Sequence, residues 1–82
     1  MLNSKEIKLN NILHYGLVEI RILASRKRED KRIFQLANIL HNLPNGIRDI
    51  DNFNFNRLEL NLRHYQKLYK DDCIDFIKLL NE

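Results

Sequence analysis

Apolar positions recur at helical spacing along almost the whole chain. Between residues 4 and 24, one sector of about 140° on a helical wheel collects most of the apolar positions. These are Leu9, Ile12, Leu13, Gly16, Leu17, Ile20, Leu23 and Ala24. Asn3 can cap this segment, and Glu6 stands three residues further on, where a capping box needs an acid. The pattern predicts a first helix from Ser4 to Ala24.

The same predicted helix is also apolar on its opposite side. The residues there are Ile7, Tyr15, Val18 and Ile22. A helix with two apolar faces is either enclosed in a bundle or shares one face with another chain. A small chain shields one such face more readily than two, so we expect these four side chains to form a protein interface. Gly16 costs about 1 kcal/mol against alanine in a helix, which predicts a close packing contact at that position.

The segment from Ile33 to Gly46 predicts a second helix and its end. Its apolar and borderline positions are Ile33, Phe34, Leu36, Ala37, Ile39, Leu40 and His41, and its polar remainder is Gln35, Asn38 and Asn42. This distribution predicts a central helix that is buried on most of its circumference. The Leu-Pro-Asn-Gly sequence that ends at Gly46 predicts a turn, because proline fixes the first corner and asparagine and glycine accept positive φ.

Two more helices are predicted in the C-terminal half. The third spans about Arg57 to Lys70, with Asn54 or Asn56 as its cap. Its stripe is Leu58, Leu62, Tyr65 and Tyr69, and the stripe of the final helix is Cys73, Phe76, Ile77 and Leu80. We expect Asp71 and Asp72 to cap that short final helix. Residues 47–56 are expected to form a loop, anchored on the core by Phe53 and Phe55, or a short extended segment.

These elements predict an all-α fold, a small three- to four-helix up-and-down bundle in which residues 1–82 make a single helical domain. Hydrophobic residues make up 44% of the chain and charged residues 30%, which is ordinary for a globular domain. A chain of 82 residues buries a modest share of its surface, so its stability margin is thin. Self-association would supplement that margin.

The densest charge lies between the first two predicted helices, from Ser25 to Arg32. One interpretation is a solvated connector whose cations suit the negative end of the first helix. The alternative is a sequence-independent contact with nucleic-acid phosphates. The residues that would make this contact are Arg26, Lys27, Arg28, Lys31 and Arg32. Two acids within the run, the lack of interleaved aromatic residues and a net charge of only +3 favour the connector.

The expected cellular compartment follows from three features that the sequence lacks: a second cysteine, a membrane span and a secretion signal. Cys73 is the only cysteine, which excludes an internal disulfide and favours a reducing compartment. No apolar run approaches the ~18 residues of a membrane span, and the N-terminus lacks the order of a secretion signal. We therefore expect a cytoplasmic protein that does not associate with membranes.

Residues that could carry chemistry are few. His14, His41 and His64 fall on three different predicted helices and lack a spacing that would pair two metal ligands on one face. We expect His14 and His41 to be partly buried, each with a local hydrogen bond. Cys73 falls on a predicted core face, where it would serve as a small hydrophobic residue.

Two further kinds of site are excluded by the residues present. Asp49-Ile50-Asp51 resembles the start of a calcium loop, but Asn54 and Leu60 occupy the positions of the required glycine and glutamate. With only two glycines, the chain lacks the glycine-rich loop that binds phosphate. The sequence predicts no enzyme, no metal and no cofactor. It predicts a non-enzymatic protein-interaction module that forms a homo-oligomer or binds a protein partner. The alternative is a small nucleic-acid-binding or regulatory protein that uses residues 26–32.

Overall fold

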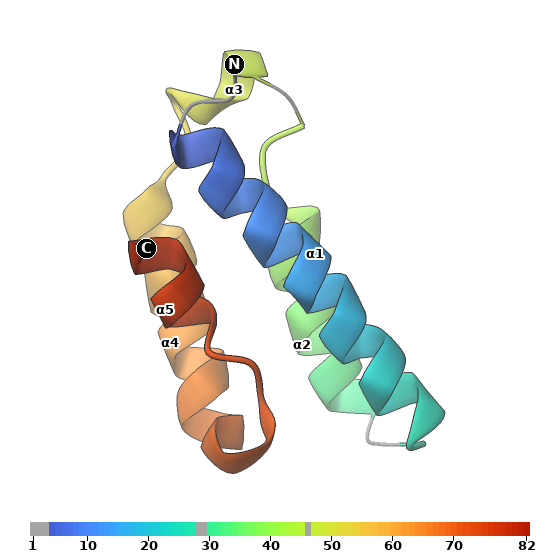
Figure 1. Cartoon of the computed structure of the whole chain (residues 1–82). Helices are drawn as coiled ribbons and strands as arrows, with labels where there is room; N and C mark the ends of the chain where they lie inside the picture. The colour runs from blue at the N-terminus through green and yellow to red at the C-terminus, as the bar shows by residue number, and fades with distance from the viewer. Residues whose placement is uncertain (1–3, 28–29, 46) are drawn as a thin grey trace.

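The computed structural model describes residues 4–27, 30–45 and 47–82, and these form helices and turns without a strand. The elements are α1 (Ser4–Ser25), α2 (Asp30–His41), α3 (Ile47–Ile50), α4 (Phe55–Tyr69), a 3₁₀ turn (Lys70–Asp72) and α5 (Phe76–Asn81). Successive long helices run in opposite directions, with the short α3 across one end (Figure 1). The predicted all-α up-and-down bundle is confirmed.

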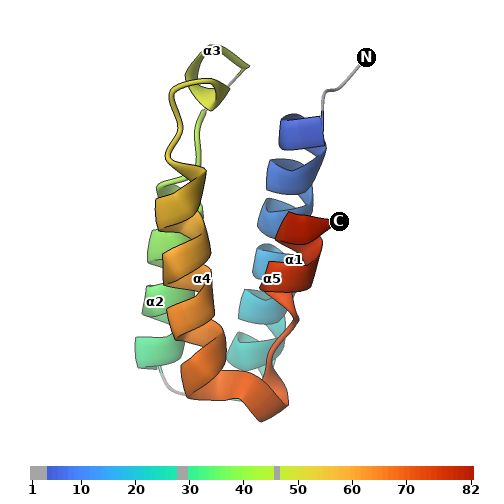
Figure 2. The ribbon, with the colours of Figure 1, turned by 90° about the vertical axis from the view of Figure 1, so that its left-hand side faces the viewer.

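The four helices α1, α2, α4 and α5 form a ring around one core. Contacts join α1 to α2, α2 to α4, α4 to α5 and α5 back to α1. Figure 2 shows α2 and α4 on one side of the bundle and α1 and α5 on the other. The buried apolar cluster at the centre is Leu9, Ile12, Leu36, Leu40, Ile50, Leu58, Leu62, Tyr65, Phe76 and Leu80. The six residues of α5 cover about 9 Å along the bundle and the 22 residues of α1 about 33 Å, so α5 flanks only part of α1.

Gly16 makes the close contact that the sequence predicts. A Cβ atom at this position would lie 2.6 Å from Cδ2 and 2.7 Å from Cδ1 of Leu40. Such distances are well inside van der Waals contact, so the missing side chain of α1 makes room for a leucine of α2. The close neighbour is therefore a side chain of α2.

The turn into α4 confirms one of the two predicted caps. The side-chain oxygen of Asn54 accepts a hydrogen bond from the backbone N–H of Arg57 at 3.0 Å. Phe53 and Phe55 meet edge to face, with ring centroids 5.1 Å apart, and both pack against the core. The segment before them was expected to be a loop or extended, but residues 47–50 form one helical turn, whose Ile50 is buried.

The cap of the final helix is not the one that the sequence predicts. Residues 70–72 form the 3₁₀ turn, and α5 starts only at Phe76. Asp75 caps it by accepting from the N–H of Lys78 at 3.0 Å, and the Gln66 side chain of α4 accepts from the N–H of Ile77 at 2.8 Å. The prediction of Asp71 and Asp72 as caps was wrong, because α5 begins after the extended residues 73–75.

α2 is less enclosed than its apolar residues predict. Leu36 and Leu40 are buried, but Phe34 is 71% exposed and His41 is also exposed. The long helices that contact α2 are α1 and α4, so its third side faces solvent. The expectation of a helix buried on most of its circumference was therefore wrong.

Candidate functional site

The outer face of α1 is the surface on which the predicted interface residues lie. We use this name for Ile7, Tyr15, Val18 and Ile22 together. Ile7 is 47% exposed, Tyr15 40% and Ile22 40%, while Val18 is partly buried. Helical spacing places these side chains away from the side of α1 that packs into the bundle, and Ile22 also borders the hollow that Cys73 lines.

A second edge of α1 is also exposed, which the sequence did not predict. Leu13 and Leu17 belong to the stripe expected in the core, yet they are 41% and 43% exposed. Helical spacing places Leu17 at the margin of that stripe, whereas Gly16, nearer its centre, packs against Leu40 of α2. Leu17 and Ile22 thus have nearly equal exposure on sides of one helix about 140° apart.

The charges that α1 presents to solvent all have one sign. Lys5 and Arg21 are exposed and Lys8 is partly exposed, whereas both acids of the helix, Glu6 and Glu19, are buried. The described outer surface of α1 is therefore apolar and cationic, although the helix sequence contains both signs.

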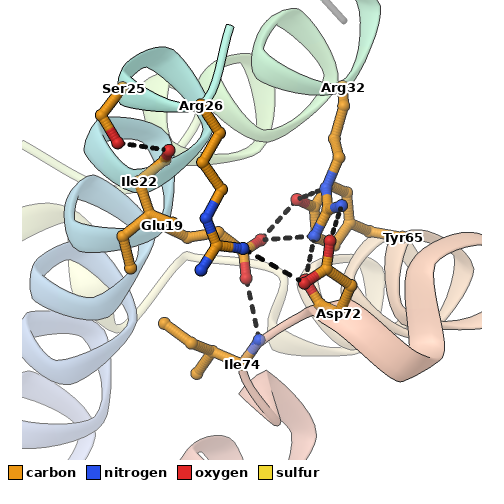
Figure 3. A network of polar contacts seen from close by, with 8 residues as sticks. All are labelled: Glu19, Ile22, Ser25, Arg26, Arg32, Tyr65, Asp72 and Ile74. Carbon is orange, nitrogen blue, oxygen red and sulfur yellow. Dashed lines mark hydrogen bonds and ion pairs between the residues drawn. The ribbon is translucent and has the colours of Figure 1, made fainter. Parts of the chain in front are cut away.

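A buried polar network, which the sequence analysis missed, joins four segments of the chain (Figure 3). Arg32 donates from Nε to the hydroxyl oxygen of Tyr65 at 2.9 Å, and Tyr65 in turn donates to the carboxylate of Glu19. Arg32 also donates to the backbone carbonyl and the carboxylate of Asp72. Glu19 accepts from the backbone N–H of Ile74 at 2.8 Å. The network therefore ties α1, α2 and α4 to the segment that leads into α5.

Burial and pairing fix the protonation of the network. Burial lowers the pKa of Arg32, but its hydrogen bond to Tyr65 and the negative charges of Glu19 and Asp72 outweigh this effect, so its pKa is raised. Burial also raises the pKa of Tyr65 above its ordinary value. The arginine therefore stays charged, and the tyrosine hydroxyl keeps the proton that it donates to Glu19.

The network removes Arg32 from the charged connector. Its side chain is 6% exposed, so the expectation that Arg32 offers an exposed cation to phosphates was wrong. Arg26 remains half-exposed, and its guanidinium lies 3.6 Å from a carboxylate oxygen of Asp72. Lys27 and Lys31 are exposed, and Arg28 lies outside the described residues. No feature on the sequence marks Arg32 as different from the cations around it.

A hollow of about 300 Å³ lies beside the network and reaches Cys73. Burial, aided by the carboxylate of Glu19, raises the pKa of this thiol to about 11. The thiol is therefore protonated and a weak nucleophile at neutral pH. This fits the small hydrophobic residue that the sequence predicts, although Cys73 is only partly buried.

The three histidines do not form a site. His14, His41 and His64 are exposed on α1, α2 and α4, so the expectation that His14 and His41 are partly buried was wrong. Within the described residues, no three His, Cys, Asp or Glu side chains are grouped so that they could hold a metal ion. Among the helices of the described chain, none combines the length and the apolar character needed to cross a membrane.

No protein-family model, curated protein or solved structure with which the chain was compared matches it. Functional inference for this chain therefore depends on its own residues.

Proposed function

We propose that the protein is a non-enzymatic interaction module that self-associates through the outer face of α1. One observation carries the proposal: Ile7, Tyr15 and Ile22 each keep at least 40% of their surface exposed after the helices have packed. Removing apolar surface from water stabilises an assembly by about 25 cal/mol per Å². A partner that packs on this face would bury the apolar surface that the chain itself leaves exposed.

Two copies of α1 can cover each other in a symmetric way. Ile7 lies about 12 Å from Tyr15 along the helix axis, and Ile22 lies about 10 Å from Tyr15 in the other direction. An antiparallel pair with its two-fold axis near Tyr15 therefore places Ile7 of one copy opposite Ile22 of the other. Such a contact is self-complementary and closes as a dimer.

The charges beside this face give self-association a distinctive dependence on salt. The exposed and partly exposed charges of α1 are cations, so two copies that meet there repel each other at low ionic strength. Salt screens this repulsion and leaves apolar burial in place. Self-association should therefore strengthen as sodium chloride is raised.

Sedimentation equilibrium of the full chain over a range of concentrations tests the proposal. We expect a mass that rises with concentration and with salt, and a loss of this rise in Ile22→Ser. Leu17→Ser is the matched control, because Leu17 has 43% exposure on the other edge of the same helix. A chain that stays monomeric at high concentration and high salt would refute the proposal. If Leu17→Ser loses association while Ile22→Ser keeps it, the contact lies on the Leu17 edge of α1 and the proposed interface is wrong.

The alternative proposal, nucleic-acid binding through residues 26–32, has weaker support. Lys27 and Lys31 are exposed, but Arg26 is paired with Asp72 and Arg32 is buried. This alternative predicts affinity for DNA or RNA that falls as salt rises, which is the opposite dependence. Anisotropy of a labelled oligonucleotide at ~50 mM salt, with Lys27→Ala and Lys31→Ala, distinguishes the two functions.

A further inference from the structure

A groove lies between α2 and α4 and has no part in the proposed self-association. Two hollows, of about 360 Å³ and 480 Å³, share Ile39, Asn42 and Asn61 and so form one groove. Figure 2 looks toward these two helices, with α4 in front of α2. None of the outer-face residues of α1 lines it.

Carboxamides dominate the walls of this α2–α4 groove. They are Gln35, Asn38, Asn42, Asn52, Asn54 and Asn61. The floor is apolar, with Ile39 and Leu58 among its residues, and no carboxylate belongs to the described lining. Arg57 is the one lining residue with a fixed charge. The groove is thus rich in groups that both donate and accept hydrogen bonds, and it favours a neutral or negative ligand.

Four of these carboxamides, Asn52 among them, make no hydrogen bond to another described residue and so have unused hydrogen-bonding capacity. Three of the four lie on α2, directly after it, or on α4. Gln35 accepts from the hydroxyl of Tyr69 at 2.7 Å, and Asn54 is the cap of α4. The side chains of Asn38, Asn42 and Asn61 make no hydrogen bond to another described residue, and all three are exposed. They come from both walls of the groove, two from the α2 side and one from α4.

The spacing of these carboxamides matches an extended polypeptide. Asn38 and Asn42 are four residues apart, and the backbone N–H of Asn42 bonds the carbonyl of Asn38 at 3.2 Å, so helical geometry continues between them. They are therefore separated by about 6 Å along the axis. An extended chain presents the N–H and C=O of every second residue on the same edge, at intervals of about 6.6 Å. One carboxamide can bond both groups of one such residue.

We propose that the α2–α4 groove binds an extended segment of a partner protein through its backbone. Asn38 and Asn42 pair with one edge of the segment, and Asn61 pairs with it from the opposite wall. An apolar side chain of the segment packs over Ile39 and Leu58. Because Arg57 is the one fixed charge of the lining, an acidic residue near that apolar side chain would be favoured.

The lining favours a peptide over a single-stranded nucleic acid. Nucleic-acid grooves of this kind combine several cations with open aromatic faces on which bases stack. Here the rings that contribute to the lining are those of His64, Phe53 and Tyr65, and Tyr65 is 2% exposed. Asparagine is frequent in this chain, so the density of carboxamides alone does not favour a peptide ligand. Their spacing and their unused hydrogen-bonding capacity do.

A displayed library of random peptides, selected on the full-length protein, tests the proposal. We expect enriched peptides that combine an apolar residue with a nearby acid. A labelled synthetic copy of one of them should lose about 3- to 10-fold in affinity for each of Asn38→Ala, Asn42→Ala and Asn61→Ala. Asn56→Ala is the matched control, because Asn56 is an exposed asparagine of α4 that does not line the groove. Methylation of alternate backbone nitrogens of the peptide should abolish binding.

Three results would overturn the proposal. One is a selection that fails: either no peptide is enriched over the unselected background, or the enriched peptides bind the groove variants and Asn56→Ala with the same affinity. Another is binding that survives backbone methylation on either edge, because the peptide backbone would then be unused. A third is binding of an oligothymidylate that is lost in Asn38→Ala and Asn61→Ala, because the groove would then be a nucleic-acid site. Asn61→Ala should self-associate as the wild type does, and Ile22→Ser should bind the peptide with unchanged affinity, because none of the outer-face residues of α1 lines the groove.

Discussion

Two adjacent residues of α1, Val18 and Glu19, differ in burial in the opposite sense to their hydropathy. Glu19 is 4% exposed inside the polar network, while Val18, on the outer face, is only partly buried. The helix turns by about 100° between them, so one side chain points into the bundle and the other points away from it. Position on the helix, and what the other helices bring to that position, therefore decides burial.

The difference follows from the partners that each side meets. Glu19 meets a hydroxyl, a guanidinium and a backbone N–H, which together satisfy its carboxylate. A buried charge without such partners costs several kcal/mol. Ile22 stays 40% exposed, so it forgoes only part of the about 1.5–3 kcal/mol that full burial of an apolar side chain supplies. The bundle therefore tolerates an uncovered isoleucine more easily than an unpaired glutamate.

The largest expected effect is the loss of one partner within the network. Glu19→Ala leaves Arg32 with one carboxylate partner, Asp72, and removes the acceptor of Tyr65 and of the backbone N–H of Ile74, so the free energy of unfolding should fall by about 3–5 kcal/mol. Glu59→Ala removes an acid from a surface pair, in which Arg63 lies 3.6 Å away, and should cost less than about 0.5 kcal/mol. Urea unfolding followed by circular dichroism measures both changes.

Arg32→Met sharpens the same comparison. This variant leaves Glu19 buried without its cation, so we expect a loss of similar size, again about 3–5 kcal/mol. The double variant Glu19→Leu/Arg32→Met removes both charges and should lose less than the sum of the single losses. Equal costs for Glu19→Ala and Glu59→Ala would show that the network contributes no more than a surface pair.

The sequence predicted the helices because their residues are close in the chain. The spacing of Leu58, Leu62 and Tyr65 places three side chains on one face whatever surrounds them, and all three are buried. The cap at Asn54 was equally local. The network was not predictable in this way, because Glu19, Arg32, Tyr65 and Asp72 lie on separate segments. Nothing near Arg32 in the sequence distinguishes a buried arginine from an exposed one.

The next largest effect concerns the inner face of α1. Gly16→Ala places a methyl group within 2.6 Å of a Leu40 methyl carbon. The overpacking costs about 1–3 kcal/mol and the gain in helix propensity returns about 1 kcal/mol, so we expect a net loss of about 1 kcal/mol. In a Leu40→Ala background the same substitution should become stabilising. An unchanged sign in that background would mean that Leu40 does not limit this position.

Alkaline pH should weaken the fold through the groups that burial keeps protonated. Burial raises the pKa of Cys73 to about 11 and also raises the pKa of Tyr65. In the unfolded chain these groups titrate near about 8.5 and 10, so the unfolded state releases its protons first. Their contribution is complete at neutral pH and is lost as pH rises, by about 1 kcal/mol near pH 10 once the partial exposure of Cys73 is allowed for. Urea midpoints between about pH 8 and 11 measure the loss.

The variant Cys73→Ala separates the two contributions to this pH dependence. It should shift the start of the decline upward, to the range in which the unfolded tyrosine titrates. A decline that begins at the same pH in both proteins would contradict the contribution of the thiol.

The outer face could be predicted in part, because its residues are close in the chain, whereas the contacts that they meet come from separate segments. Helical spacing placed Ile7, Tyr15, Val18 and Ile22 on one face. These side chains stay exposed because their face points away from the buried side of the same helix, although Val18 is partly buried. Leu13 and Leu17, predicted in the core, are exposed, which helical spacing alone did not indicate.

The smallest expected effect belongs to Val18, the other member of the adjacent pair. At protein concentrations low enough to keep the chain monomeric, Val18→Asn should change the free energy of unfolding by less than about 0.5 kcal/mol, since valine and asparagine have similar helix propensities and the site is at the surface. At high concentration the same variant should unfold at a lower temperature than the wild type, because the wild type gains stability from association and the variant does not. Calorimetric scans at two concentrations measure this difference. A large loss for the dilute monomer would mean that Val18 is packed within its own chain, and the contrast with Glu19 would then disappear.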